Sequence, residues 1–139
     1  AADPAGMKNL AVVADHLVAT ASRIRATGRK VVLMSPTPES SNNIGQCLTK
    51  VILFAENEES CDFQTPSQLD NKAAFRLVDR VNFVIPVIRL DRMICRDRLC
   101  DTMQKGVMIY RDQGHLSIEG ASLLGREFHW AEAARAAAR

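Results

Sequence analysis

The stretch Lys30-Val31-Val32-Leu33-Met34-Ser35 decides the fold class of this chain of 139 residues. Its four central residues are apolar and do not alternate with polar ones, as they would in a strand that has one face in water. A strand of this kind is buried on both faces, and such strands belong to parallel sheets that helices cover. Pro36 and Pro38 end the strand, because proline has no N–H group to donate to a ladder.

A helix precedes this strand. Apolar residues recur at i, i+3, i+4 and i+7, which predicts an amphipathic helix over residues 8–27, with Gly28 at its C′ position. The residues of the pattern are Leu10, Val13, Ala14, Leu17, Val18, Ala21 and Ile24. The chain therefore begins with a helix that leads directly into a buried strand.

The middle of the chain contains a loop and two further helices. Ser, Asn, Pro and Glu dominate residues 37–45, which predicts a loop, and a short helix is expected over residues 46–57. A longer helix is predicted over residues 66–80, because Thr65 can cap it, Pro66 suits its first turn and Gln68 can complete a capping box. Its buried face is expected to consist of Leu69, Ala73, Leu77, Val78 and Val81.

Two more extended segments and a last helix follow. Residues 83–88 are apolar and predict a strand, which Pro86 places at a sheet edge or near a strand end. Residues 107–110 predict a third short strand. Ser117 is expected to cap a helix that runs from residue 118 toward the carboxy end, where Ala and Arg favour helix.

Helices that alternate with buried strands indicate an α/β layered fold with a mainly parallel sheet. Sites in such sheets form beyond the carboxyl ends of the strands. The loops that follow Ser35, Ile88 and Tyr110 are therefore the places where a site is expected.

Length and composition exclude several classes of protein. A chain of 139 residues suits one globular domain, and 47% hydrophobic with 24% charged residues argues against disorder. The 18 Lys and Arg against 16 Asp and Glu leave little excess positive charge, so nucleic acid is not an expected partner. No apolar run approaches the ~20 residues that span a bilayer. The amino end shows neither a signal peptide nor a starting Met, so the chain is expected to be processed or cut from something longer.

Asp112 and His115 lie in the loop after the strand at residues 107–110. In a Ser-His-Asp triad the carboxylate accepts from one imidazole nitrogen, so that the other nitrogen can take the proton of the nucleophile. The spacing of three residues lets both side chains converge at one sheet edge, and Gly114 helps the backbone to turn. His115 is therefore a candidate base with Asp112 as its orienting acid; the alternative is that both only stabilise the loop. His16 and His129 lie in helical patterns and are interpreted as surface or core-edge residues.

The four cysteines lack the Cys-x-x-Cys spacing of zinc and thioredoxin-like sites, so a metal role is not expected. Their even number and local spacing favour two disulfides, Cys47 with Cys61 and Cys95 with Cys100. Such bonds imply an oxidising compartment. The alternative is four buried thiols in a cytosolic protein, which the polar neighbours of Cys61, Cys95 and Cys100 disfavour.

A basic cluster lies between residues 89 and 101. It consists of Arg89, Arg92, Arg96 and Arg98, interleaved with Asp91, Asp97 and Asp101. Mixed signs of this kind are typical of a solvated, salt-bridged surface. Binding of acidic sugars is the alternative.

The stretch from Asp112 to Ala121, Asp-Gln-Gly-His-Leu-Ser-Ile-Glu-Gly-Ala, resembles the last block of the SGNH hydrolase superfamily, Asp-x-x-His-Leu-Ser-x-x-Gly. The order of motifs is most similar to the SGNH domains attached to integral-membrane acyltransferases of the acyltransferase-3 family. Those domains show a helix and then a Gly-x-x-Val-x-x-x-x-Pro-x-Pro stretch, seen here over residues 28–38. A cysteine after the loop (Cys47) and a cysteine pair before the last block (Cys95 and Cys100) extend the resemblance over most of residues 8–128.

This resemblance implies a flavodoxin-like, three-layer α/β/α domain on the periplasmic side of the bacterial inner membrane. The domain would add or remove O-acyl groups on cell-surface glycans, joined to an integral-membrane acyltransferase domain in the same polypeptide. By the same resemblance His115 is the catalytic base and Asp112 its orienting acid. A serine attacks the acyl ester, and the acyl group passes to a sugar hydroxyl or to water. No metal or organic cofactor is expected.

The chain departs from the family pattern at the nucleophile. The family carries its serine in a Gly-Asp-Ser block, with oxyanion donors from that serine, a later Gly and an Asn block, and none of these occurs here. Asn42 and Asn43 come after the Pro-x-Pro stretch, and Ser35, although at a strand end, is an unsuitable substitute because Pro36 lacks a backbone donor. Without a nucleophile and oxyanion donors, His115 and Asp112 do not sustain acyl transfer by themselves.

Two hypotheses follow for function. The first is that residues 1–139 are the carboxy-terminal part of a single SGNH-type esterase or O-acyltransferase domain, incomplete at its amino end, whose nucleophile lies upstream; this chain alone would be inactive. The second is a non-catalytic module that keeps the fold and binds glycan or protein.

Overall fold

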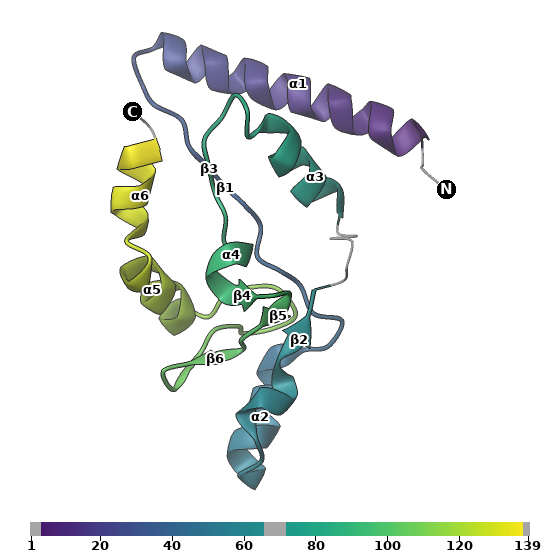
Figure 1. The fold of residues 1–139 in the computed structure, drawn as a ribbon, viewed down its shortest axis with the longest axis vertical. Coiled ribbons are helices and arrows are strands. Elements are labelled where there is room, and N and C mark those ends of the chain that lie inside the picture. Colours follow the sequence, from purple (N-terminus) through teal and green to yellow (C-terminus); the bar gives the residue numbers. More distant parts are fainter. Residues whose placement is uncertain (1–3, 66–71, 138–139) are drawn as a thin grey trace.

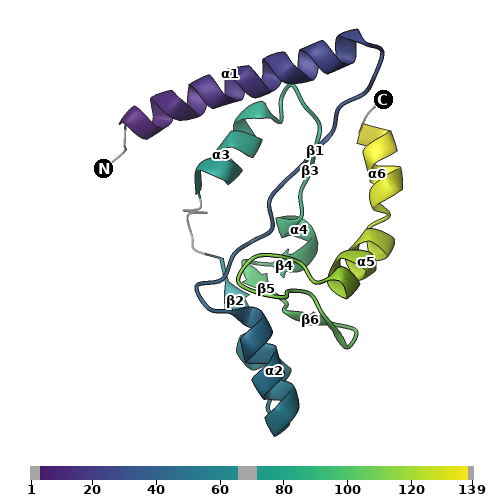
Figure 2. The ribbon, with the colours of Figure 1, turned by 180° about the vertical axis from the view of Figure 1, so that it is seen from behind.

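Residues 4–65 and 72–137 are described by the computed structural model. Figure 1 shows two strands running between α3 and α6, with α1 across one end and α2 projecting from the other; Figure 2 shows the same arrangement from behind. The elements are α1 (Pro4–Ala26), β1 (Leu33–Met34), α2 (Ile44–Phe54), the 3-10 helix η1 (Glu58–Cys61), β2 (Phe63–Gln64), α3 (Lys72–Val81), β3 (Val87–Ile88), α4 (Asp91–Ile94), β4 (Cys95–Arg96), β5 (Leu99–Cys100), β6 (Met103–Gln104), β7 (Val107–Met108), α5 (Ile118–Glu127) and α6 (Trp130–Ala137). The α/β class is confirmed.

The parallel pair β1–β3 lies at the centre of this arrangement. Leu33 pairs with Val87, and the N–H of Ser35 donates to the carbonyl of Ile88 at 2.9 Å. The predicted helix over residues 8–27 is confirmed as α1, and it packs with α3 on the pair through one buried cluster. That cluster consists of Ala14, Ala21, Val81 and Ile85, with Leu17, Val18, Val31, Leu33 and Leu77 packed around it. Gly28 has φ +79°, as a C′ residue requires.

A mainly parallel sheet is not confirmed. Among the described strands only β1–β3 is parallel, whereas β2–β5–β4 and β6–β7 are antiparallel. Two tight turns cause the difference: Asp97 and Arg98 between β4 and β5, and Lys105 and Gly106 between β6 and β7, all with positive φ. Two successive positive φ angles match the twist of a hairpin and fold the chain back on itself. The predicted strand at residues 107–110 is therefore the second arm of a hairpin.

Three predicted elements differ in their bounds. The helix predicted over 46–57 is α2, which begins earlier because the Asn43 side chain accepts from the N–H of Gln46 at 3.0 Å and caps it. The strand predicted over 83–88 is reduced to β3, because the N–H groups of Val84 and Ile85 bond back to the carbonyl of Val81 in a turn. The predicted start of the helix at 66–80, with Pro66, Gln68 and Leu69, lies outside the described residues.

The last helix begins as predicted but is interrupted. The Ser117 side chain accepts from the N–H of Gly120 at 2.7 Å and caps α5, so this prediction is confirmed. His129 then takes φ +47°, which separates α5 from α6. The bend places the partly buried Trp130 against the main core, where its indole N–H donates to the sulfur of Met93 at 3.2 Å. Side-chain packing has thus overridden the helix preference of the sequence.

The main core lies on the other side of the molecule from the α1–α3 cluster and includes both disulfides. Its buried members come from α2, α4, α5 and the segments between them: Ile44, Leu48, Val51, Cys61, Leu90, Ile94, Cys100, Ile109, Tyr110, Leu123 and Leu124. Cys61 and Cys100 are buried here, so their polar neighbours in sequence were a poor guide to their exposure. They are half-cystines and not thiols.

Both predicted disulfides are present. Cys47–Cys61 joins α2 to η1, and Cys95–Cys100 closes the β4–β5 hairpin. No cysteine is left as a free thiol. The interpretation as four buried thiols is therefore wrong for this structure.

Removing the first disulfide tests how much it stabilises the fold. The double variant Cys47→Ala/Cys61→Ala should lose about 3 kcal/mol of unfolding free energy. A bond that closes a loop of ~15 residues lowers the conformational entropy of the unfolded chain, which raises its free energy by that amount. Urea denaturation measures the loss. Thr49→Ala, on the exposed face of α2, is the control and should unfold near the wild-type midpoint. An unchanged midpoint in the double variant contradicts a stabilising role.

Candidate active site

Residues 111–115, here named the His115 loop, form a closed turn after β7. Tyr110 and Leu116 form an antiparallel bridge at its base, and the N–H of Arg111 donates to the carbonyl of His115 at 3.0 Å. The Asp112 carboxylate lies inside the turn and accepts from the backbone N–H groups of Gly114 at 3.0 Å and His115 at 2.8 Å. The backbone therefore fixes the position of the carboxylate.

The imidazole of His115 contacts this carboxylate directly. Its Nδ1 lies 3.0 Å from Oδ1 and 2.9 Å from Oδ2 of Asp112. This contact leaves Nε2 as the nitrogen that can exchange a proton with a reacting group. The His115 side chain is 72% exposed, so a second group can reach that nitrogen.

The same contacts hold Asp112 in its ionised form. Hydrogen bonds from the backbone N–H groups of Gly114 and His115, and then from the His115 side chain, lower the pKa of Asp112 from 3.8 to about 2. A carboxylate that is ionised at neutral pH accepts the Nδ1–H hydrogen bond and favours the tautomer with a free Nε2. The spacing noted in the sequence has therefore brought together a base and the group that can orient it.

The loop after β1 supports the His115 loop. The N–H of Ser40 donates to the carbonyl of Gln113 at 2.8 Å, and the Thr37 hydroxyl donates to the carbonyl of Gly114. A Cβ on Gly114 would lie 2.6 Å from Cγ of Glu39, so any other residue there forces Glu39 to move. Two of the three loops expected to hold a site thus lie in contact.

The third loop, after Ile88, has a structural role. Leu90 donates its N–H to the buried Ser35 hydroxyl at 2.9 Å, and that hydroxyl donates to the carbonyl of Pro36 at 3.0 Å. The bond from Leu90 joins the ends of the two parallel strands, and the bond to Pro36 holds the hydroxyl in place within its own segment. Ser35 is therefore unavailable as a nucleophile, in agreement with the sequence argument.

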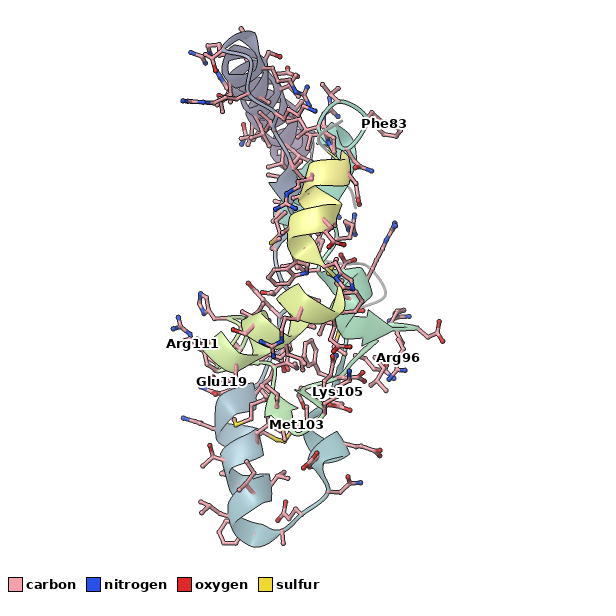
Figure 3. All side chains as sticks on the ribbon, turned by 90° about the vertical axis from the view of Figure 1, so that its left-hand side faces the viewer. Phe83, Arg96, Met103, Lys105, Arg111 and Glu119 are labelled. Carbon is pink, nitrogen blue, oxygen red and sulfur yellow. A yellow bond between two sulfur atoms is a disulfide. The ribbon has the colours of Figure 1, made fainter. Side chains whose placement is uncertain are left out.

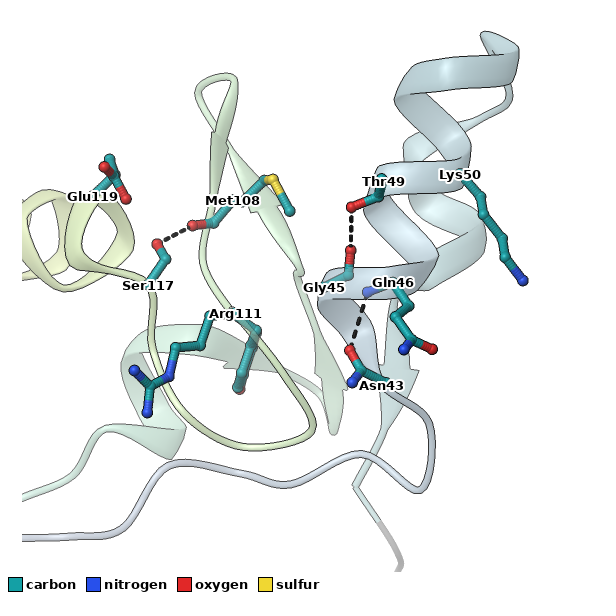
Figure 4. Close-up of a pocket in the computed structure, with 10 residues that line it drawn as sticks. Asn43, Gly45, Gln46, Thr49, Lys50, Met108, Arg111, Ser117 and Glu119 are labelled. Carbon is teal, nitrogen blue, oxygen red and sulfur yellow. Dashed lines mark hydrogen bonds between the residues drawn. The ribbon is translucent and has the colours of Figure 1, made fainter.

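A pocket of about 550 Å³ lies beside the His115 loop, between that loop and the first turns of α2 (Figure 4). Its lining residues are Asn43, Gly45, Gln46, Thr49, Lys50, Met108, Tyr110, Arg111, Ser117 and Glu119. Arg111 belongs both to this pocket and to the site, because its Nε lies 3.5 Å from Oδ2 of Asp112. The pocket therefore adjoins the charged pair.

The position of α2 was not foreseeable from local sequence. A Cβ on Gly45 would lie 2.1 Å from the carbonyl oxygen of Arg111, so only glycine allows this approach. Gly45, which the sequence predicts to end the loop over residues 37–45, is the one sequence signal for a close backbone contact. This glycine does not indicate which distant segment makes the contact.

The chain matches the family described as "SGNH domain (fused to AT3 domains)" over residues 2–129. It belongs to this SGNH family. No curated protein and no solved structure matches it. No helix in the described parts of this SGNH domain is both long and apolar enough to cross a bilayer.

The remaining candidates of this SGNH domain lie away from the His115 loop. His16 is exposed on α1, and His129 is exposed between α5 and α6, with Nδ1 3.8 Å from Glu132. The basic cluster is salt-bridged only in part: among the described residues Arg89 pairs with Asp79 and Asp91, and Arg96 with Asp101, and the Arg89 side chain is largely buried. The binding of acidic sugars by these arginines stays a hypothesis.

The low pKa of Asp112 predicts an acid-dependent loss of stability. Between about pH 4 and about pH 2 the carboxyl binds a proton more readily in the unfolded chain than in the folded one, so the folded state loses stability as pH falls through this window. Asp112→Asn should flatten the pH dependence of the urea midpoint there. A carbon NMR titration of Asp112 should show a midpoint near 2. A midpoint near the ordinary value, or identical pH profiles for both proteins, contradicts the hydrogen bonding described above.

Proposed function

We propose that this SGNH domain supplies the base of a serine esterase or O-acyltransferase site that acts on O-acyl groups of cell-surface glycans. The contact between Nδ1 of His115 and the Asp112 carboxylate, in a loop beyond the carboxyl ends of the parallel strands, carries the proposal. The serine and the oxyanion donors come from a segment outside these 139 residues. The chain alone is then inactive.

The proposed reaction uses His115 twice. Nε2 takes the proton of the serine hydroxyl while the serine oxygen attacks the carbonyl carbon of the ester, and the same nitrogen then returns the proton to the departing alcohol. In the second half Nε2 takes a proton from a sugar hydroxyl or from water, whose oxygen attacks the carbonyl carbon of the acyl-serine, and Nε2 then returns the proton to the departing serine oxygen as the new ester or the free acid leaves. Asp112 stabilises the imidazolium formed in each half. No proton or group is left unassigned.

The open edge of β1 supports a larger parallel sheet in the whole domain. β1 pairs with β3 along one edge, and none of the other described strands pairs with its second edge. The Met34 side chain of β1 is exposed, although the apolar run over residues 31–34 is typical of a strand buried on both faces. A further parallel strand at this edge would complete a flavodoxin-like, three-layer domain, of which residues 1–139 form the carboxy-terminal part.

The proposal also includes an oxidising compartment and a membrane domain as partner. Two disulfides without a free thiol support an oxidising compartment, and we propose that it is the periplasmic face of the bacterial inner membrane. The family description names fusion to AT3 domains, which supports an integral-membrane acyltransferase domain in the same polypeptide.

A non-catalytic module for glycan or protein binding is the second candidate. The absence of Gly-Asp-Ser from the sequence favours it, and so does the pocket, whose lining includes the polar side chains of Gln46, Thr49, Lys50 and Glu119, which can bond to hydroxyl groups. The coding DNA upstream of Ala1 separates the two: an in-frame Gly-Asp-Ser after an apolar strand favours the enzyme, and a start codon near Ala1 favours the module.

Substitution of the base tests the enzyme directly. In the intact protein, His115→Ala should lower kcat/KM on a small acetyl ester by at least about 10³-fold, because the serine then lacks its base. Ester hydrolysis followed by absorbance measures the loss. His16→Ala removes an exposed histidine on α1 and should keep wild-type activity. Full activity in His115→Ala contradicts the proposed role.

A further inference from the structure

One end of the molecule combines exposed apolar side chains with several Lys and Arg side chains. Phe83, in the turn between α3 and β3, is 94% exposed, and its neighbour Val84 is exposed too. The Arg25 guanidinium donates to the carbonyl of Val84 at 3.1 Å, which ties this turn to the end of α1, where Ile24 is also exposed. Figure 3 shows Phe83 pointing away from the ribbon at this end.

The parallel register and α3 bring three more cations to the same end. Leu33 lies opposite Val87, so four residues earlier on each segment Arg29 and Phe83 approach the same end of the strands. Lys30 follows Arg29, and Arg80 lies in the last turn of α3. Arg29, Lys30 and Arg80 are all exposed.

The charged residues of the two segments that form this end are all positive. Residues 23–30 and 80–84 contain five of the 18 Lys and Arg residues and no Asp or Glu, in a chain whose net charge is only +2. We name this surface the Phe83 edge: Ile24, Phe83 and Val84, with Arg23, Arg25, Arg29, Lys30 and Arg80. Its positive charge is therefore concentrated and not part of a general basic character.

We propose that the Phe83 edge docks on a bilayer surface that contains anionic phospholipid. Lys and Arg are attracted to anionic headgroups, and an aromatic side chain between them is placed at the boundary of headgroups and acyl chains. A polyanion in water would pair with the cations but leave Phe83, Val84 and Ile24 exposed. The apolar side chains thus favour a membrane over a nucleic acid.

The opposite end of the molecule provides a contrast. α2 ends in the exposed residues Ile52, Leu53 and Phe54, but Glu56, Glu58 and Glu59 follow directly. These carboxylates repel an anionic surface. Of these two ends, the Phe83 edge therefore has the charge that matches anionic lipid.

Docking through this edge sets the orientation of the His115 loop. The Phe83 edge lies at the amino ends of β1 and β3, whereas the loop after β1 and the His115 loop lie beyond their carboxyl ends. The His115 loop then faces away from the bilayer. This inference goes beyond the proposed function and holds whether or not His115 is catalytic.

Sedimentation with vesicles tests the proposal on the 139-residue chain. The chain should bind vesicles of phosphatidylcholine mixed with phosphatidylglycerol at least about tenfold more tightly than vesicles of phosphatidylcholine alone, and high salt should remove the difference. Arg29→Gln/Lys30→Gln should weaken binding to the mixed vesicles about thirtyfold. Phe83→Ser keeps the charge and should weaken it at least about tenfold.

Matched variants at the other end complete the test. Lys50→Gln/Lys105→Gln removes the same charge far from the Phe83 edge, and Phe54→Ser removes an aromatic side chain that is 71% exposed; both should bind as the wild type does. Equal weakening by these variants, or wild-type binding by Phe83→Ser, overturns the proposal. Binding of single-stranded DNA with the same affinity and the same dependence on Phe83 overturns it in favour of a polyanion site.

Discussion

The pairing of β1 with β3 is the contact on which the rest of the structure depends. It aligns the two strand ends, and the Ser35 hydroxyl, which accepts from the N–H of Leu90, fixes the chain where it leaves both strands. From that point the loop after β1 runs to the His115 loop and bonds to the carbonyls of Gln113 and Gly114. A short parallel ladder thus controls the position of a base that lies outside it.

The sequence predicted those features that depend on neighbours along the chain. Periodic apolar residues defined α1, and Ser117 marked the start of α5. Local spacing gave both cysteine pairs, and the Asp112-x-x-His115 spacing gave the contact now seen between the two side chains. In each case the interacting groups are close in sequence, so the chain itself limits the alternatives.

The features that the sequence did not predict depend on unusual backbone angles or on packing between segments that are distant in sequence. Asp97, Arg98 and Lys105 adopt positive φ without being glycine, so the hairpins that reverse the chain gave only a weak signal. Phe83 continued an apolar run that is typical of a strand, yet it is almost fully exposed in a turn. The pocket beside the His115 loop requires α2, which is separated from that loop by residues 55–110.

The His115 loop also has a mechanical property. Each hydrogen bond that orients the imidazole is made within residues 111–115, from the Arg111–His115 backbone bond to the contacts of Asp112. The histidine and its carboxylate therefore move together as one rigid unit. A displacement of the loop changes the distance from the imidazole to any reacting partner but leaves its tautomer and its angle to the carboxylate unchanged.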